Sequence, residues 1–357
     1  MNTTLKHWKE AATLILAAGR GRGFTPRAPS LFDYDVLLLK RSGKGGFMPN
    51  AYVFPGGVVD ASDFSSEWLD IFRSFTNSPT FGLRSVKQHL ETRPPIFATD
   101  RLKLGSPIPG EVALRICALR ETFEESGVLL HYGVNDLCSS ELTKWRALVN
   151  QNPSNFIRMC RELQVLPNIW ALHEWGNWLT PASRYGTTRF DTAFFICCLQ
   201  EIPHTLQDDK EIERFQWSTP SEILQSYQAQ KLWIAPPQFY ELSRLCRFPL
   251  LNDLHNFASQ RATAGCEQWM PVVVSNDEHL ISLLPGDKLY PVDSPRDSEA
   301  AKNTVPPSKD HQDASPLHRI VISDRYTLRV QITITPKYNH VLPVAHSAVS
   351  HDSKSQL

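Results

Sequence analysis

The sequence predicts a mixed α/β fold in which one sheet lies between layers of helices. Two observations support this prediction. Strand-length apolar runs are interspersed with segments of helical periodicity, an order that is typical of a sheet covered by helices. The chain has 357 residues, of which 41% are apolar, so it can bury a sizeable core and is too long for one small domain.

Two strands and a Gly-Gly turn are expected in the first part of the chain. The strands are the apolar runs TLILAAG at 13–19 and DYDVLLLKR at 33–41, and the turn lies in FPGGVVDASD at 54–63. Apolar runs of this length, bounded by glycine or proline, are typical of strands that end in turns. We expect the sheet to begin here.

A segment of about residues 61–110 interrupts this order. It contains several prolines and one short amphipathic piece, SSEWLDIFRSF at 65–75. We expect it to form a helix and an irregular excursion over the mouth of any site that the Gly-Gly turn borders. Long loops of this kind act as lids or specificity elements, or they are neutral surface insertions, and the sequence leaves both interpretations open.

The segment 111–130, EVALRICALRETFEESGVLL, predicts a helix. Its apolar residues at helical spacing fall on one stripe, which consists of Val112, Ile116, Leu119 and Phe123. Gly127 can adopt the left-handed conformation that ends a helix. The apolar residues after it predict that the chain turns into a strand.

The later elements complete the expected layers. We expect a helical stretch at 142–163, a strand at 191–199, a helix at 236–246, and strand character at 269–275 and 278–286. Residues 1–290 are interpreted as the main domain, 292–316 as a polar disordered linker, 317–342 as two paired strands, and 343–357 as a flexible tail.

Three carboxylates crowd the end of the predicted helix. Glu121, Glu124 and Glu125 lie opposite the apolar stripe, and the segment contains no lysine to offset them. Like charges at this spacing destabilise a helix by roughly 0.2–0.5 kcal/mol per pair. Leu114 and Cys117 lie on the same side, so this face is expected to be sheltered and to bind a hard divalent cation. The alternative is a solvated acidic helix face, which is common.

The end of the predicted helix resembles the second half of the Nudix box, the signature of hydrolases that cleave nucleoside diphosphates linked to another moiety. The residues that carry this resemblance are Arg120, the three glutamates and Gly127. The segment 54–63 resembles the first half. From Gly57 to Arg120 there are 63 positions, about 49 more than the contiguous motif has. A long surface insertion costs little loop-closure entropy, so the split is physically allowed. Asp63 and Glu111 are both candidates for the acid of the first half.

The split box resembles the peroxisomal branch of the Nudix family that cleaves coenzyme A. This resemblance implies an α/β/α sandwich with an insertion in the box and a small C-terminal β extension. It also implies Mg²⁺ or Mn²⁺ held by Glu121, Glu124 and Glu125, with Arg120 orienting a carboxylate. The products would be 3′,5′-ADP and 4′-phosphopantetheine or its acyl form. A further catalytic carboxylate is expected at Glu211, and Glu213 is the alternative candidate.

Substrate-binding residues are expected upstream of the insertion. The coenzyme A signature of that branch keeps its spacing at Arg41, Ser42, Gly56 and Gly57. The second arginine and the glycine of that signature are replaced here by Gly46 and Asn50. Lys44 could substitute for the missing cation, and a flexible hairpin turn is the alternative interpretation. An aromatic segment could also line the cleft or serve only for packing; it contains Trp175, Trp178, Arg184, Tyr185 and Arg189.

Charge and cysteine usage exclude several classes of protein. Lys plus Arg and Asp plus Glu number 37 each, so no net charge draws the chain to nucleic acid or membranes. No apolar run approaches the roughly 18–20 residues that a membrane span needs, and the N-terminus does not resemble a secretory signal. The seven cysteines form no CxxC pair, which predicts a reducing compartment and argues against a zinc site.

The hypothesis is therefore a metal-dependent diphosphatase whose substrates are coenzyme A and its thioesters. One alternative is a Nudix hydrolase of another nucleoside diphosphate derivative, including an RNA cap. A second is a low-turnover nucleotide-binding protein, although such a protein has no need of clustered carboxylates. Ser355, Gln356 and Leu357 approximate the S-K-L peroxisomal signal, which predicts an import receptor as a partner; cytoplasm and mitochondrion are the alternative locations.

Overall fold

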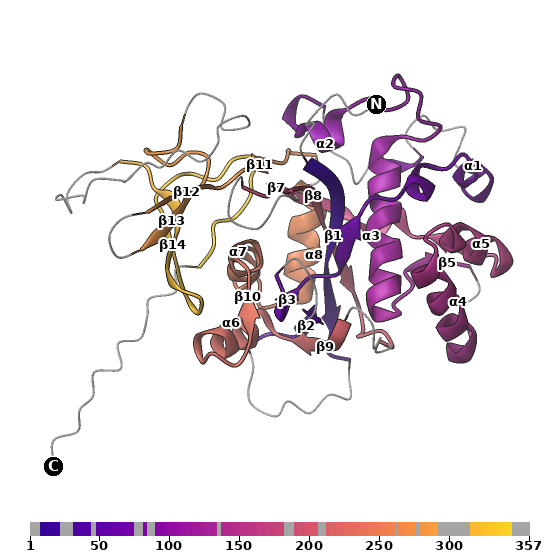
Figure 1. Cartoon of the computed structure of the whole chain (residues 1–357), viewed down its shortest axis with the longest axis horizontal. Helices are drawn as coiled ribbons and strands as arrows, with labels where there is room; N and C mark the ends of the chain where they lie inside the picture. Colours follow the sequence, from indigo (N-terminus) through magenta and orange to yellow (C-terminus); the bar gives the residue numbers. More distant parts are fainter. Residues whose placement is uncertain are drawn as a thin grey trace, which may run out of the picture.

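A large mixed sheet forms the centre of the structure, which is a computed structural model (Figure 1). The structure describes residues 8–21, 31–43, 48–74, 81–83, 90–133, 137–181, 189–205, 212–261, 263–275, 279–291 and 315–344. Within these ranges the sheet has nine strands. They are β1 (Trp8–Gly19), β2 (Tyr34–Arg41), β3 (Ala51–Val53), β4 (Gly56–Val58), β7 (His173–Leu179), β8 (Arg189–Leu199), β9 (Ile212–Ser218), β10 (Trp233–Ile234) and β11 (Gln268–Trp269).

The central strand β1 fixes the topology of this sheet. The strand order is β10-β3-β2-β1-β8-β7-β11, with β4 added beside β1 and β9 beside β2. β1 is parallel to β8 from Trp8 to Ala18 but antiparallel to β2 and β4. The predicted mixed sheet is thus confirmed. A strand that is covered on both faces must be apolar on both, which accounts for the continuous run in β1.

Helices cover both faces of the sheet. They are α1 (Trp68–Ile71), α2 (Pro95–Ala98), α3 (Gly110–Ser126), α4 (Ser139–Gln151), α5 (Asn155–Glu162), α6 (Pro220–Gln228), α7 (Pro236–Leu245) and α8 (Leu251–Arg261). Leu14 and Leu16 of β1 join the core formed with α3. Ile15 and Ala17 join a second core with α6, α7 and α8. Alternate side chains of one strand therefore hold the two helical layers of the predicted α/β/α sandwich (Figure 1).

Helix α3 agrees closely with the prediction. The four apolar residues of its predicted stripe are at most 2% exposed. Gly127 ends the helix with φ of 73°, a conformation that glycine adopts without strain. Arg146 of α4 donates hydrogen bonds of 2.8 Å to the carbonyl oxygens of Glu124 and Glu125. These bonds satisfy carbonyl groups at the helix end and fix the backbone beneath the acidic side chains.

The insertion packs into the protein core. It contains α1 and α2 and the 3₁₀ helices η1 (Ala61–Phe64) and η3 (Leu90–Thr92). Trp68 and Phe97 are buried in the α3 core, and the Trp68 ring lies 6.0 Å from that of Phe156 in α5. A buried ion pair of 2.6 Å joins Arg93 to Glu174 of β7. The helix expected within 65–75 is α1, and residues 102–105 are irregular and exposed as expected. The inward packing of Trp68 and Phe97 was not part of the expectation.

A smaller sheet lies beside the main one and contains β12 (Val272–Ser275), β13 (Leu280–Leu283), β14 (His318–Asp324) and β15 (Thr327–Ile332), in that order. The two strands expected in 317–342 pair as β14 and β15, and β13 joins them to β12. Two short strands, β5 (His131–Tyr132) and β6 (Leu166–Pro167), form a separate pair, and the 3₁₀ helix η4 (Ile169–Ala171) follows β6 in the chain.

Two predicted segments lie largely outside the described residues, namely 292–314 of the linker and 345–357 of the tail. No helix in the described ranges is long and apolar enough to cross a membrane.

Candidate active site

The Gly-Gly turn and the acidic helix meet in space despite their separation in sequence. The backbone N–H of Gly56 donates a 2.8 Å hydrogen bond to a carboxylate oxygen of Glu125. A Cβ atom at Gly57 would lie 2.4 Å from an oxygen of Glu121, so a larger residue would collide with this carboxylate. The structure therefore brings together the two halves of the split motif.

Gly56 is constrained on its other side by β1. Its φ is 153°, and a Cβ atom there would lie 2.4 Å from the backbone oxygen of Ala12. β4 pairs with β1 through Ala11, Ala12 and Thr13. At Gly56 both the positive φ and the backbone of β1 therefore favour glycine, whereas at Gly57 a larger side chain would displace the Glu121 carboxylate.

Arg120 is the centre of the cluster. Its Nε and Nη2 atoms donate to the two oxygens of Asp63 at 2.8 and 2.9 Å, and its Nη1 donates to Glu121 at 2.8 Å and Glu124 at 2.7 Å. The bidentate pairing with Asp63 orients the guanidinium plane. Glu111 lies in the first turn of α3. Asp63, at the start of the insertion, is thus the acid that completes the cluster.

The cluster contains more negative than positive charge. Arg120 is the shared partner of Asp63, Glu121 and Glu124. Burial, opposed by Arg120 and reinforced by Glu121, raises the pKa of Glu124 to about 7. Burial and the nearby Asp63 also raise the pKa of the Cys117 thiol well above its ordinary value, so this thiol is neutral and is no nucleophile. An additional cation would stabilise the charged carboxylates.

The carboxylates have the donor chemistry of a divalent-cation site. Carboxylate oxygens are the hard ligands that Mg²⁺ and Mn²⁺ prefer. Among the described residues, no three His, Cys, Asp or Glu side chains already converge as one ligand set. Glu121 and Glu124 instead direct an oxygen at Arg120. The residues fit a cation by chemistry and charge, because Glu121 and Glu124 each direct only one of their two carboxylate oxygens at Arg120.

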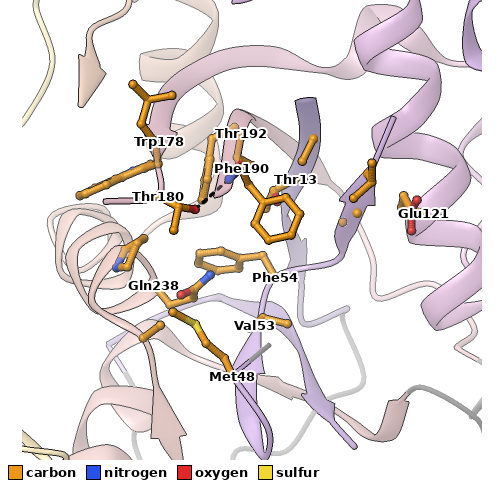
Figure 2. Close-up of a pocket in the computed structure, with 18 of the residues that line it drawn as sticks. Thr13, Met48, Val53, Phe54, Glu121, Trp178, Thr180, Phe190, Thr192 and Gln238 are labelled. Carbon is orange, nitrogen blue, oxygen red and sulfur yellow. Dashed lines mark hydrogen bonds between the residues drawn. The ribbon is translucent and has the colours of Figure 1, made fainter. Parts of the chain in front are cut away.

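A pocket of about 530 Å³ extends from the acidic cluster. Glu121, Glu124 and Glu125 line it together with Gly56 and Gly57. In Figure 2, Glu121 lies at the right of the view, and the rings of Phe54 and Phe190 lie to the left of it near the centre. Further along are Trp178 and Gln238 (Figure 2). The pocket thus combines an acidic region with an extended aromatic and apolar wall, as is common in small-molecule sites.

The other predicted substrate residues have different positions. Arg41 lines the pocket, and its buried Nε atom has no hydrogen-bond partner among the described residues. Ser42 follows it but is not part of the described lining. Trp178 lines the pocket, whereas Trp175 is buried in the second core. Arg189 lies 4.8 Å over the Trp8 ring.

Several predicted residues lie outside the described part of the chain. They are Lys44, Gly46, Arg184, Tyr185, Glu211 and the terminal Ser355, Gln356 and Leu357; the side chain of Glu213 is likewise not described. None of the described residues from 61 to 110 lines the pocket, and the role of the insertion as a lid, a specificity element or a neutral insertion stays a prediction. The pocket residues on β1, α7 and the small sheet were not predicted from the sequence. Strand alternation marks such positions but does not show what they face.

Comparisons with known proteins extend beyond the motif. A family model described as the NUDT19 Nudix domain matches residues 8–245, and another described as the NUDT19 C-terminal domain matches residues 273–333. The chain is similar to the acyl-coenzyme A diphosphatase NUDT19 of Xenopus laevis, with 48% identity over 388 residues and 100% of both chains covered. The Homo sapiens protein of the same name is 41% identical, with 94% of each chain covered.

A solved structure supports the fold. A NUDIX hydrolase from Alicyclobacillus acidocaldarius aligns with a TM-score of 0.50 at 21% identity. The alignment covers 70% of this chain and 96% of that chain. At this identity the likeness supports the fold alone.

Proposed function

The chain belongs to the Nudix hydrolase family, within its NUDT19 group, and we infer that it is a diphosphatase of coenzyme A and acyl-coenzyme A. The reaction adds water across the diphosphate and yields 3′,5′-ADP and 4′-phosphopantetheine or its acyl form. The observation that carries this inference is the reunited motif, in which Gly56 and Gly57 contact Glu125 and Glu121 across the insertion. The relatives named acyl-coenzyme A diphosphatase support the substrate class.

The residues of the site prepare the diphosphate for attack by water. Nudix hydrolases depend on a divalent cation, and we propose Mg²⁺ or Mn²⁺ held by Glu121, Glu124 and Glu125. When bound, such a cation masks the negative charge of the diphosphate and stabilises the charge that develops on its oxygens. Arg120 acts as a positioning residue, because its pairing with Asp63 holds the guanidinium beside two of these carboxylates. Gly56 and Gly57 keep side chains out of the space where the backbone and the carboxylates approach each other.

Arg41 is the proposed contact for a phosphate of coenzyme A. It lines the same pocket, and its buried Nε donor lacks a partner among the described residues. A buried donor without a partner is costly, and a phosphate oxygen would satisfy it with a charge-assisted hydrogen bond. Ser42 and Lys44 remain predicted neighbours of this contact. Glu211 and its rival Glu213 remain predicted as the further carboxylate.

A substrate panel tests the function. Purified protein with Mg²⁺ is incubated with coenzyme A, its thioesters, ADP-ribose, dinucleotides and capped RNA, and the products are separated by chromatography. We expect 3′,5′-ADP from coenzyme A and its thioesters at rates well above those for the other compounds. Faster cleavage of a dinucleotide or of capped RNA would assign the other enzymatic alternative. Binding of coenzyme A without product would indicate the low-turnover binding protein.

We also propose that the protein acts in peroxisomes. Ser355, Gln356 and Leu357 approximate the S-K-L signal that the peroxisomal import receptor binds. A fluorescent protein fused in front of the chain is expected to accumulate in peroxisomes, and changing Leu357 to aspartate is expected to leave it in the cytoplasm. Equal distribution of the two fusions, or accumulation in mitochondria, would contradict this location.

A further inference from the structure

Three strands of the small C-terminal sheet contribute to the wall of the active-site pocket. Val273 of β12, Ser282 of β13 and Ile322 of β14 line it. Val273 pairs with Ser282, and Ser282 pairs with Ile320, which is two positions from Ile322. Because side chains two positions apart lie on the same face of a strand, these residues form one continuous face.

The opposite face of this sheet has its own core. Val274, Ile281 and Leu283 form a separate buried cluster, against which Val272 and Tyr290 pack. On the pocket-facing side, Ile320 is buried in the core shared with α7, and Ile322 packs against that core. Ile322 also lines the pocket with Val273 and Ser282, so this edge of the face can contact a ligand.

The small sheet is held firmly against the main domain. The Tyr240 hydroxyl and His318 Nε2 are 2.9 Å apart, and the Tyr227 hydroxyl donates to the carbonyl oxygen of Arg325 at 3.0 Å. Ile320 and Leu328 belong to the core shared with α7. Buried polar and apolar contacts at several points fix the position of the face over the pocket.

The uncharged side chains of this face match the acyl chain of the substrate, which is also uncharged. The residues that the small sheet contributes to the pocket are uncharged, and Trp178 and Phe194 of the main sheet line the same pocket. The nucleotide half of coenzyme A carries a 3′-phosphate, whose burial requires a cationic partner. The acyl chain requires apolar surface instead, and gains roughly 0.8 kcal/mol for each methylene group that it buries.

We propose that the C-terminal sheet forms the acyl-binding wall of the site, with Val273, Ser282 and Ile322 as residues that determine chain-length specificity. The proposal rests on the proposed diphosphatase function and adds which part of the substrate the C-terminal sheet contacts. The diphosphate lies at the acidic cluster, and the acyl end extends along the pocket to the face formed by these three side chains. Free coenzyme A lacks the acyl group and does not depend on this wall.

Two neighbouring valines provide a matched test. Val273 faces the pocket and Val272 lies on the other face of the same strand, and both are half-buried. The Val273→Phe and Val272→Phe variants are assayed for kcat/KM with free coenzyme A and with acetyl, octanoyl and palmitoyl thioesters. We expect Val273→Phe to lower kcat/KM for the longer thioesters about 10-fold relative to free coenzyme A, because added bulk in an apolar pocket discriminates by this order. Val272→Phe is expected to leave the ratio unchanged.

A smaller side chain gives the second measurement. Val273→Ala is expected to shift the preference toward longer thioesters, and thermal unfolding shows whether each variant is folded. An equal loss for free coenzyme A and all thioesters would overturn the proposal, since it would place the nucleotide half or the common arm at this wall. Unchanged ratios in both Val273 variants would also overturn it. If the unmodified protein releases no 3′,5′-ADP from any of these compounds, the diphosphatase function itself fails.

Discussion

Replacing Glu125 with glutamine is expected to lower kcat for coenzyme A on the order of 10²–10³-fold, which is the usual cost of removing one preorganised electrostatic group. Glutamine keeps the shape of the side chain and an oxygen that can accept the 2.8 Å hydrogen bond from Gly56. It removes the negative charge that a divalent cation requires. Steady-state rates at saturating Mg²⁺ and substrate measure the effect, and circular dichroism checks the fold.

Glu162 provides the matched control. It lies on the exposed end of α5, where it forms an ion pair of 2.6 Å with Arg158, and both side chains are at least 50% exposed. Glu162→Gln makes the same chemical change away from the pocket and is expected to leave kcat within about twofold, because exposed ion pairs contribute little. Near-normal turnover by Glu125→Gln would show that this carboxylate is not part of the catalytic site.

Replacing Arg120 with methionine is expected to destabilise the fold by about 3–5 kcal/mol, the range observed when one partner of a buried ion pair is removed. The Arg120 side chain is 2% exposed and is the shared partner of Asp63, Glu121 and Glu124. Methionine retains much of the apolar volume, so the loss is mainly electrostatic. Urea denaturation in the absence of divalent cations measures the free energy of unfolding.

An exposed arginine gives the comparison for this variant. Arg161 pairs with Glu67 at 2.9 Å, and both side chains are about half exposed. Arg161→Met is expected to change the free energy of unfolding by at most about 1 kcal/mol. Adding Mg²⁺ or Mn²⁺ is expected to restore part of the stability of Arg120→Met, because the cation offsets the same negative charges. A loss below 1 kcal/mol for Arg120→Met would contradict the role of its guanidinium as the centre of the cluster.

The sequence predicts best what depends on local periodicity. Helix α3, its buried stripe and its end at Gly127 follow from spacing alone, because a helix places residues at fixed angles. The contact between Gly57 and Glu121 was predicted through resemblance to a known motif. The choice between Asp63 and Glu111 was not predictable, since residue spacing cannot show how an insertion returns the chain to the helix.

The packing of the insertion and the position of the C-terminal sheet depend on long-range contacts, so the sequence did not predict them. The described part of the insertion has only short helical turns, and its one amphipathic piece, at 65–75, indicates a helix but not the core against which Trp68 packs. The strands of the C-terminal sheet were recognisable by alternation. Their position over the pocket depends on contacts such as Tyr240 with His318, 78 positions apart, which no local pattern encodes.

The parallel pairing of β1 with β8 has a consequence for synthesis on the ribosome. Gly19, the last residue of β1, precedes Arg189, the first of β8, by 170 positions. At translation rates of about 5–20 residues per second, β1 emerges roughly 10–30 s before its main partner exists. During this time β2 and β4 are the strands with which its apolar run can already pair.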